Sequence, residues 1–351
     1  MSWQGIEGHD QVVERFRRIL TGGRLASTFL FIGPGGIGKR AFALKLAQSL
    51  LCERSADEAL APCGDCPSCQ QVVAQSHPDV ELVAKPKDKS FIPLETFIGD
   101  REHRMREGLC HNMALKPHGG RRKIAIIDDA DYLNQEGANC LLKTLEEPPP
   151  NSLIILIGTS EQRQLPTIRS RCQIVRFKPL PVKVIATLVS ANGISQTRGE
   201  TEALATLSDG SMERAVQFAE PELAEFRQEL MTRLGKLFER STGFAADVGA
   251  FVDAAGKDAP IRRERLKLVL GIAADYYRWL LHARTGHEVH GDEVLARVLQ
   301  QSPVARDADA VAACVERCLD AQQQVDANAN QATLIECWID DLANLMQGTR
   351  A

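Results

Sequence analysis

The chain has 351 residues, of which 44% are apolar, 25% charged and 5% aromatic, and this composition excludes disordered and fibrous proteins. With 42 Lys and Arg against 46 Asp and Glu residues, the net charge is −4, so any contact with nucleic acid must come from a local patch or from partner subunits. The most apolar stretch, residues 153–157, is far shorter than the roughly 20 residues that cross a bilayer, and no secretory signal follows Met1, so we predict a cytoplasmic protein without membrane contact.

The first half of the chain alternates between two kinds of segment. Up to about residue 177, short apolar runs of β-strand character are separated by stretches with helical periodicity, the pattern of a parallel sheet covered by helices. Helices are predicted over residues 12–20, 39–51 and 134–146, and prolines 148–150 end the last of these. The predicted strands are residues 28–32, 80–83, 124–128, 153–158 and 173–177.

A phosphate-binding loop follows the first predicted strand and opens the next helix, which is the context that supports a P-loop. Glycines let backbone amides face the phosphates, and the lysine neutralises the β- and γ-phosphates. The next position carries Ser or Thr in an ordinary P-loop and binds Mg²⁺, but here it is Arg40, whose guanidinium cannot ligate a cation. We therefore expect a loop that could hold ATP or ADP without organising Mg²⁺, formed by Gly33, Gly35, Gly36, Gly38 and Lys39.

A cluster of cysteines comes after the P-loop helix. Cys63, Cys66 and Cys69 stand at three-residue spacing, with Gly64, Asp65 and Pro67 as turn-forming residues between them, and they follow Cys52 after ten intervening residues. Four thiolates match a tetrahedral zinc site, although similar spacing occurs in iron–sulfur proteins and free thiols are a further alternative. We predict structural zinc in a module at about residues 52–69, closing a loop with little core of its own. The other cysteines are predicted to be buried small apolar groups: Cys110, Cys140, Cys172, Cys314, Cys318 and Cys337.

An acidic pair ends the third predicted strand. The apolar residues 124–127 followed by Asp128 and Asp129 fit a Walker B segment, in which Asp128 would lie beside the metal. Asp129 stands where many such ATPases place a glutamate that activates water, and its side chain is one methylene shorter. Together with Arg40, this departure predicts that the chain hydrolyses ATP poorly or not at all on its own.

The segment before the last predicted strand, residues 165–172, ends in Ser170-Arg171-Cys172. With the P-loop and Leu145-Glu146-Glu147-Pro148-Pro149, it resembles the AAA+ clamp-loader family. The resemblance implies that Arg171 is an arginine finger acting on ATP held by a neighbouring subunit. It also implies that Thr159 occupies the sensor 1 position and Arg214 the sensor 2 position. A surface ion pair is the alternative for Arg171.

The rest of the chain, after residue 180, shows helical periodicity with almost no β-branched runs. Its clearest helix carries an apolar stripe, formed by Leu334, Ile335, Trp338, Ile339, Leu342 and Leu345. The family resemblance implies an AAA+ P-loop domain over residues 1–179, a helical lid over 180–219 and a helical collar domain over 220–351. The predicted fold class is thus α/β followed by all-α. The zinc module also has a counterpart in this family, inserted after the P-loop helix.

The combination of a defective P-loop with an intact Ser-Arg-Cys segment resembles a stator-type subunit, which offers its finger to a neighbour's ATP. The implied partners are gamma/tau and delta clamp-loader subunits in a pentameric ring, with the sliding clamp and primer-template DNA reached through the complex. Such a ring belongs to the bacterial DNA polymerase III holoenzyme. Two alternatives stay open: a catalytically active gamma/tau-like ATPase with an atypical metal site, and a zinc-dependent DNA-binding adaptor with a vestigial nucleotide fold.

Overall fold

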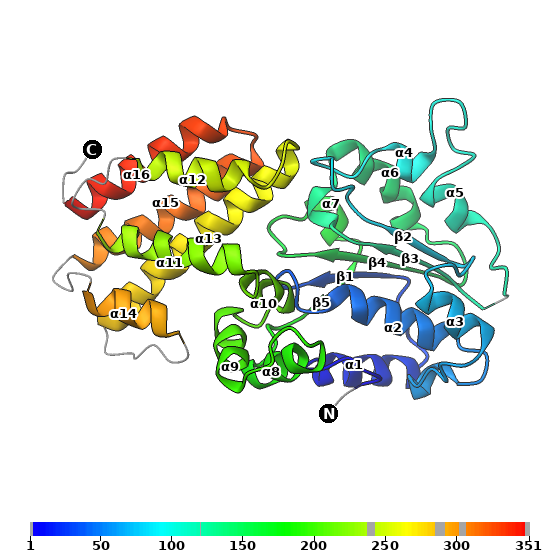
Figure 1. Cartoon of the computed structure of the whole chain (residues 1–351). Helices are drawn as coiled ribbons and strands as arrows, with labels where there is room; N and C mark the ends of the chain where they lie inside the picture. Colours follow the sequence, from blue (N-terminus) through cyan, green and yellow to red (C-terminus); the bar gives the residue numbers. More distant parts are fainter. Residues whose placement is uncertain (1–2, 120, 237–242, 285–291, 302–306, 348–351) are drawn as a thin grey trace. The chain divides into compact units, whose positions relative to one another are not determined.

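The computed structural model describes residues 3–119, 121–236, 243–284, 292–301 and 307–347 (Figure 1). The chain divides into two compact units. The first comprises Met1–Leu188 with Asp209–Arg214, and the second comprises Val189–Ser208 with Ala215–Ala351. The helix α8 (Val182–Ala191) begins in the first unit and ends in the second, and α10 (Met212–Phe218) does the same.

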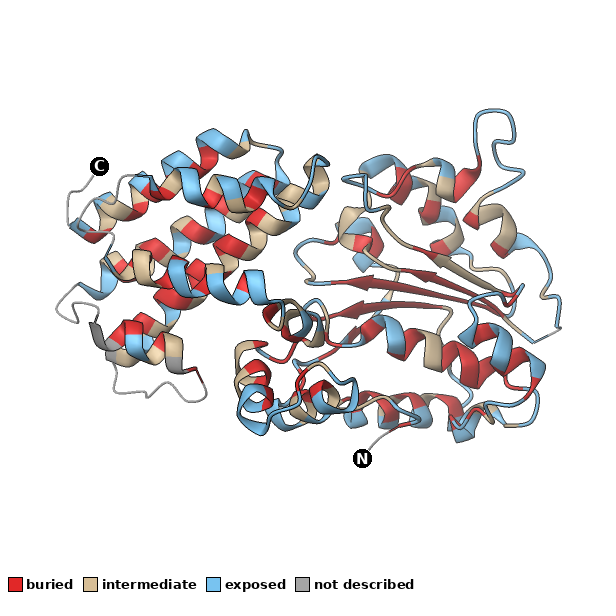
Figure 2. Cartoon of the chain, viewed as in Figure 1, coloured by how far each residue is buried: buried red, intermediate tan, exposed pale blue. Residues whose placement is uncertain are grey.

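A five-stranded parallel sheet forms the centre of the first unit, in the order β2-β3-β4-β1-β5. Its strands are β1 (Thr28–Ile32), β2 (Val80–Val83), β3 (Lys123–Ile127), β4 (Ser152–Gly158) and β5 (Gln173–Arg176). The three central strands are buried along their whole length, as Figure 2 shows, because helices cover both faces of the sheet. All five predicted strands are confirmed, with boundaries shifted by at most one residue.

Helices pack on the two faces of this sheet (Figure 1). One face carries α1 (Asp10–Thr21) and α2 (Lys39–Leu51), whose rings Phe16 and Phe42 contact Phe31 of β1. The opposite face is covered by α4 (Glu95–Ile98), α5 (Leu109–Ala114), α6 (Gln135–Glu146) and α7 (Pro166–Arg169), which share an apolar core with β1, β3 and β4. The parallel sheet covered by helices that the sequence predicts is therefore confirmed.

Helices are the regular secondary structure in the described residues of the second unit. Beyond α8 and α10, the helices are α9 (Arg198–Leu207), α11 (Pro221–Gly235), α12 (Phe244–Asp253), α13 (Ala259–Arg284), α14 (Glu293–Gln301), α15 (Ala308–Asp326) and α16 (Gln331–Gln347). The longest, α13, packs along α15, which in turn packs on α16. The helical second part of the fold class is confirmed, while the boundary between lid and collar at residue 219 stays a prediction. None of the helices within the described ranges combines the length and apolarity needed to cross a membrane.

Two predictions for individual side chains need correction. The apolar stripe on α16 continues from Leu342 to Met346, which is buried, whereas Leu345 is only half-buried. Cys337 is exposed and not buried as predicted, because it lies between the stripe positions Ile335 and Trp338 and faces away from them. Cys110, Cys140 and Cys172 are half-buried. The predicted burial is confirmed for Cys314 and Cys318 on α15.

Candidate functional site

The P-loop connects the end of β1 to the start of α2, as predicted. Gly36 and Gly38 adopt positive φ angles of 69° and 93°, which glycine tolerates without the steric cost of a Cβ. Lys39 is buried, and its Nζ donates to the backbone oxygens of Gly33 at 2.6 Å and Pro34 at 2.5 Å. The lysine that would bind phosphate thus satisfies the carbonyls of its own loop.

The predicted departure from an ordinary P-loop has a clear structural counterpart. Nη1 of Arg40 lies 3.6 Å from Oδ2 of Asp128, the carboxylate at the end of the Walker B strand β3. A guanidinium offers no lone pair, so at this position it supplies positive charge without the coordination that Mg²⁺ requires. The structure therefore brings Arg40 and Asp128 together in the manner of an internal ion pair.

The neighbouring acid, Asp129, is turned in another direction. Its backbone adopts a positive φ of 56°, and its carboxylate accepts a hydrogen bond from the backbone N–H of Lys85 at 3.3 Å. Burial, together with the adjacent charge of Asp128, raises the pKa of Asp129. Asp129 is thus engaged with the loop that follows β2.

The segment at residues 209–214 packs directly on the P-loop. The backbone N–H of Met212 donates to the carbonyl of Gly36 at 2.9 Å. A Cβ on Gly36 would overlap Ser211 and Glu213, so only glycine allows this close approach. Burial lowers the pKa of Lys39, and the carboxylates of Asp128, Asp131 and Glu213 oppose that shift. Arg214, the predicted sensor 2 residue, follows in the same segment, and its sensor role stays a prediction.

Thr159, the predicted sensor 1 residue, lies just beyond β4 and is held by an acid that sequence analysis missed. The backbone N–H of Thr159 donates to Asp131 at 2.9 Å, and its hydroxyl donates to the same carboxylate at 2.5 Å. Gln164 also donates to Asp131. The sequence offered one indication of Asp131: aspartates at positions 128, 129 and 131 place three carboxylates directly after one strand.

A second missed residue, His9, supports the P-loop from the N-terminal side. Its Nε2 donates to the carbonyl of Ile37 at 2.7 Å, and its ring packs edge-on against Phe42 and Phe177. Burial lowers the pKa of His9, so the neutral imidazole is favoured. Its position before the first helix carried no signal of this role.

Arg171 lies between α7 and β5, at the edge of the sheet where the strands begin. Its carbonyl accepts a hydrogen bond from Thr28 Oγ1 at 2.7 Å, which fixes the backbone to the first residue of β1. Its side chain is 31% exposed and forms an ion pair with Glu146 at the end of α6. The structure thus contains the surface ion pair that was the alternative for Arg171.

The four predicted metal ligands lie together. The Sγ atoms of Cys52, Cys63, Cys66 and Cys69 all lie within 4.8 Å of one another, and three of these residues are buried. Cys63 Sγ lies 4.0 Å from Cys69 Sγ, close to the roughly 3.8 Å between sulfurs bound tetrahedrally to zinc at about 2.3 Å. These thiols can therefore accommodate a zinc ion with little rearrangement.

Backbone N–H groups point at these sulfurs, as expected around thiolates. Cys63 N donates to Cys52 Sγ, Cys66 N to Cys63 Sγ and Cys69 N to Cys66 Sγ, each at 3.4 Å. Burial opposes ionisation of Cys52, but hydrogen bonds from backbone groups outweigh it and lower its pKa to about 6. Burial raises the pKa of Cys69 to about 12. The chemistry of this donor set fits structural zinc.

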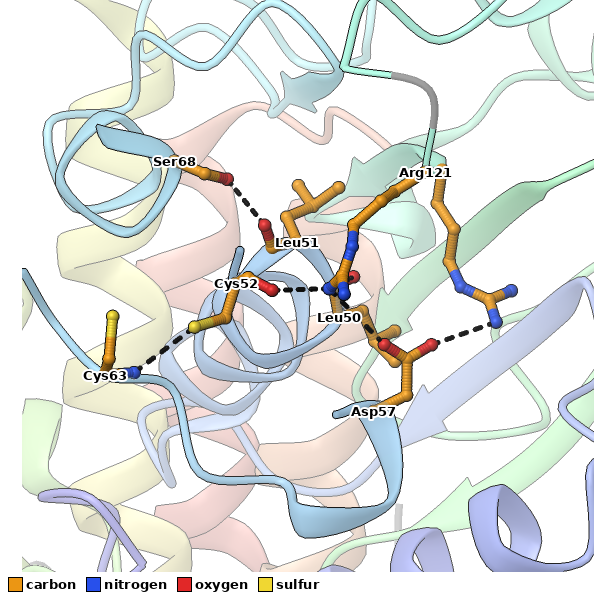
Figure 3. Close-up of polar contacts among 8 residues, drawn as sticks. Leu50, Leu51, Cys52, Asp57, Cys63, Ser68 and Arg121 are labelled. Carbon is orange, nitrogen blue, oxygen red and sulfur yellow. Dashed lines mark hydrogen bonds and ion pairs between the residues drawn. The ribbon is translucent and has the colours of Figure 1, made fainter. Parts of the chain in front are cut away.

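The cysteine cluster is joined to the sheet by two arginines that precede β3 (Figure 3). Nη1 of Arg121 donates to the carbonyl of Cys52 at 2.5 Å and to that of Leu50 at 3.5 Å, so it caps the end of α2. The same guanidinium lies 3.7 Å from Asp57, and Arg122 binds the other oxygen of Asp57 at 3.1 Å. On the other side of the cluster, Ser68 donates to the carbonyl of Leu51 at 2.8 Å.

Comparison with known proteins gives consistent results. A family model described as DNA polymerase III, delta subunit, matches residues 8–181. DNA polymerase III subunit delta' of Pseudomonas aeruginosa is 34% identical over 222 residues, which are 62% of this chain and 64% of that protein. The delta' subunit of Bacillus subtilis is 28% identical over 342 residues, covering 96% of this chain and 97% of that protein. The match thus spans less than two thirds of the Pseudomonas protein and nearly all of the Bacillus one.

Other similar proteins cover less or resemble the chain more loosely. DNA polymerase III subunit tau of Escherichia coli is 28% identical over 233 residues, which are 65% of this chain and 34% of that protein. A solved structure of a DNA polymerase III gamma subunit-related protein from Thermotoga maritima aligns with a TM-score of 0.45 at 18% identity, covering 95% of this chain and 99% of that one.

Proposed function

This chain belongs to the DNA polymerase III delta' family of clamp-loader-related subunits, and we propose that it works as a stator that completes a neighbour's ATP site. In this proposal it joins gamma/tau and delta subunits in a pentameric ring in the cytoplasm. The ring opens the sliding clamp and places it on primer-template DNA. The chain's own contribution to ATP hydrolysis is Arg171, presented to a triphosphate held by the adjacent subunit.

The observation that carries this proposal is the ion pair between Arg40 and Asp128. A P-loop ATPase needs a hydroxyl and a carboxylate to hold Mg²⁺, and the metal neutralises charge that develops on the phosphates. Here the hydroxyl is absent, and a guanidinium already neutralises the carboxylate. A divalent cation at this position would be repelled by the guanidinium. The geometry therefore supports a nucleotide fold that does not hydrolyse ATP effectively.

Arg171 is well suited to act outside its own chain. Its backbone is fixed to β1 through Thr28, while its guanidinium stays partly exposed at the sheet edge away from the P-loop. Arginine fingers stabilise charge on a transferring phosphoryl group and raise the rate by about 10³ to 10⁵. A rigid backbone with an accessible guanidinium is what such a role needs.

We further propose that the four clustered cysteines bind structural zinc. The module at residues 52–69 contains a single turn of 3-10 helix at Asp57–Ala59 and the first turn of the short helix α3 (Pro67–Val73). Its core consists of the cysteines themselves. Zinc binding would stabilise this small module because the free energy of binding is then part of the free energy of folding.

The finger role is tested in the reconstituted clamp loader with Arg171→Ala. We expect DNA-stimulated ATP turnover to fall, by about 10³-fold at the site that receives the finger, and clamp loading to slow with it. Arg169→Ala is the matched control, because it removes an exposed arginine two positions away. Turnover and clamp loading that are the same for wild type and Arg171→Ala would refute the proposal.

A second candidate function, an active ATPase of the gamma/tau type, draws on the intact backbone of the P-loop and the retained Asp128. Arg40→Thr restores the missing hydroxyl and separates the two candidates. If the rest of the site is complete, the variant gains Mg²⁺-dependent hydrolysis that Lys39→Ala abolishes. We expect no such gain, because Asp129 faces Lys85. The DNA-binding adaptor gains no support from Arg121 and Arg122, which are engaged with Asp57.

A further inference from the structure

Every nitrogen of the Arg171 guanidinium has a partner within its own chain. Nε donates to Oε1 of Glu146 at 2.7 Å, and Nη2 contacts the same oxygen. Nη1 donates to the carbonyl of Thr167 at 2.9 Å and to Ser170 Oγ at 3.1 Å. The side chain that would reach a neighbour's phosphate is therefore held by Glu146 on one edge and by the end of α7 on the other.

The two kinds of partner differ in chemistry. A guanidinium binds phosphate or carboxylate along an edge, through parallel N–H bonds. Glu146 occupies the edge formed by Nε and Nη2, and it is the one anionic partner in this set. A phosphate that binds the guanidinium along this edge would have to displace the carboxylate.

This exchange is energetically accessible. The Arg171 and Glu146 side chains are 31% and 48% exposed, and ion pairs at such accessible positions are weak. A triphosphate carries more charge than a carboxylate and would meet the guanidinium in an interface with less water. The Arg171 backbone stays anchored through the bond from Thr28, so the side chain alone has to move.

We propose that Glu146 is an intramolecular competitor for the finger, and that it sets how strongly Arg171 binds a neighbour's triphosphate. Glu146 acts through Arg171 and so is a positioning residue. In the free chain the carboxylate holds the guanidinium, and in the ring the γ-phosphate takes its place. This inference rests on the proposed function, because it requires a neighbour that holds ATP.

The test measures association of the full-length chain with its cognate gamma/tau-type subunit. That subunit is loaded either with a non-hydrolysable ATP analogue or with ADP. Glu146→Gln is expected to tighten binding to the analogue-loaded subunit about two- to fivefold, the strength of an exposed ion pair, and to leave binding to the ADP-loaded subunit unchanged. Glu147→Gln is the matched control, since it removes the same charge from the next, exposed residue.

A second background separates this inference from the proposed function. In Arg171→Ala, the further change Glu146→Gln is expected to have no effect, because the competitor has nothing left to hold. If Arg171→Ala weakens analogue-dependent binding but Glu146→Gln behaves like Glu147→Gln, the competitor role is wrong and the finger role stands. Weaker binding of Glu146→Gln would also overturn the inference, because Glu146 would then support the finger. If Arg171→Ala has no effect, the proposed function itself fails.

Discussion

Replacing Arg121 with alanine tests whether the cysteine module depends on its connection to the sheet. Arg121 donates to the carbonyls of Cys52 and Leu50 at the end of α2 (Figure 3), and Cys52 is also one of the four clustered thiols. The variant removes a charged donor from a carbonyl next to a sulfur and a positive charge near four thiolates. We therefore expect the variant to bind zinc more weakly.

The size of the effect follows from the contacts. Hydrogen bonds from charged groups are worth about 1.5 to 3 kcal/mol. The Arg121 side chain is 40% exposed, so water can replace part of its interaction, and the lower end of that range applies. About 1.5 kcal/mol corresponds to roughly a tenfold loss in affinity, at the lower edge of what outer-shell substitutions cost a metal site.

Competition with a chromophoric zinc chelator measures this affinity directly. Arg122→Ala is the control, because it removes the same charge at the next position and breaks an ion pair with Asp57 rather than a hydrogen bond to the Cys52 carbonyl, so its effect should stay within a few-fold. If both variants lose affinity equally, general electrostatics explain the result and the carbonyl cap does not. If Arg121→Ala binds zinc like the wild type, the contact contributes nothing and our reasoning is wrong.

Two further predictions concern stability. Arg227 on α11 and Asp292 before α14 form a buried ion pair, so Asp292→Ala should lower the free energy of unfolding by about 3 to 5 kcal/mol in denaturant titrations. Glu202→Ala, which breaks an exposed ion pair with Arg198, should change the free energy of unfolding far less. Burial lowers the pKa of His9 from 6.5, so the unfolded chain takes up a proton that native His9 resists, and stability should fall as the pH drops below about 6.5. Thermal melts of His9→Phe should show a flatter dependence between about pH 7 and pH 5, and equal slopes for both proteins would contradict this assignment.

Sequence patterns predicted the sheet accurately because its central strands are buried on both faces and read as continuous apolar runs. The P-loop and the cysteine cluster were found because their spacing is short and specific. The four-residue helices α4 and α7 were missed, since a single turn shows no periodicity. Their positions are set by packing against α6 and the sheet.

Local sequence patterns could not predict which residues contact the site residues. Asp131 belongs to the site because it accepts hydrogen bonds from Thr159, which is 28 positions away, and Glu146 because it binds Arg171, 25 positions away. Glu213 approaches the P-loop only after the chain has passed through α8 and α9. Such contacts follow from the tertiary fold. Likewise, only the folded chain shows that Arg121 and Arg122 bind Asp57 and that Arg121 caps α2.

The hydrogen bond from Thr28 to the Arg171 carbonyl places Arg171 and the P-loop at opposite ends of β1. Thr28 begins β1, and the P-loop starts just after Ile32, so one five-residue strand, roughly 16 Å long, separates the arginine from the loop. If the arginine edge of each subunit contacts the P-loop of the next, the subunits are arranged head to tail and all have the same orientation around the assembly. In the proposed function, a subunit whose own P-loop does not hydrolyse ATP keeps its place in that order, because its arginine edge faces the next subunit. Retaining β1 and the P-loop then keeps the Arg171 backbone in place, even where the loop does not hydrolyse ATP.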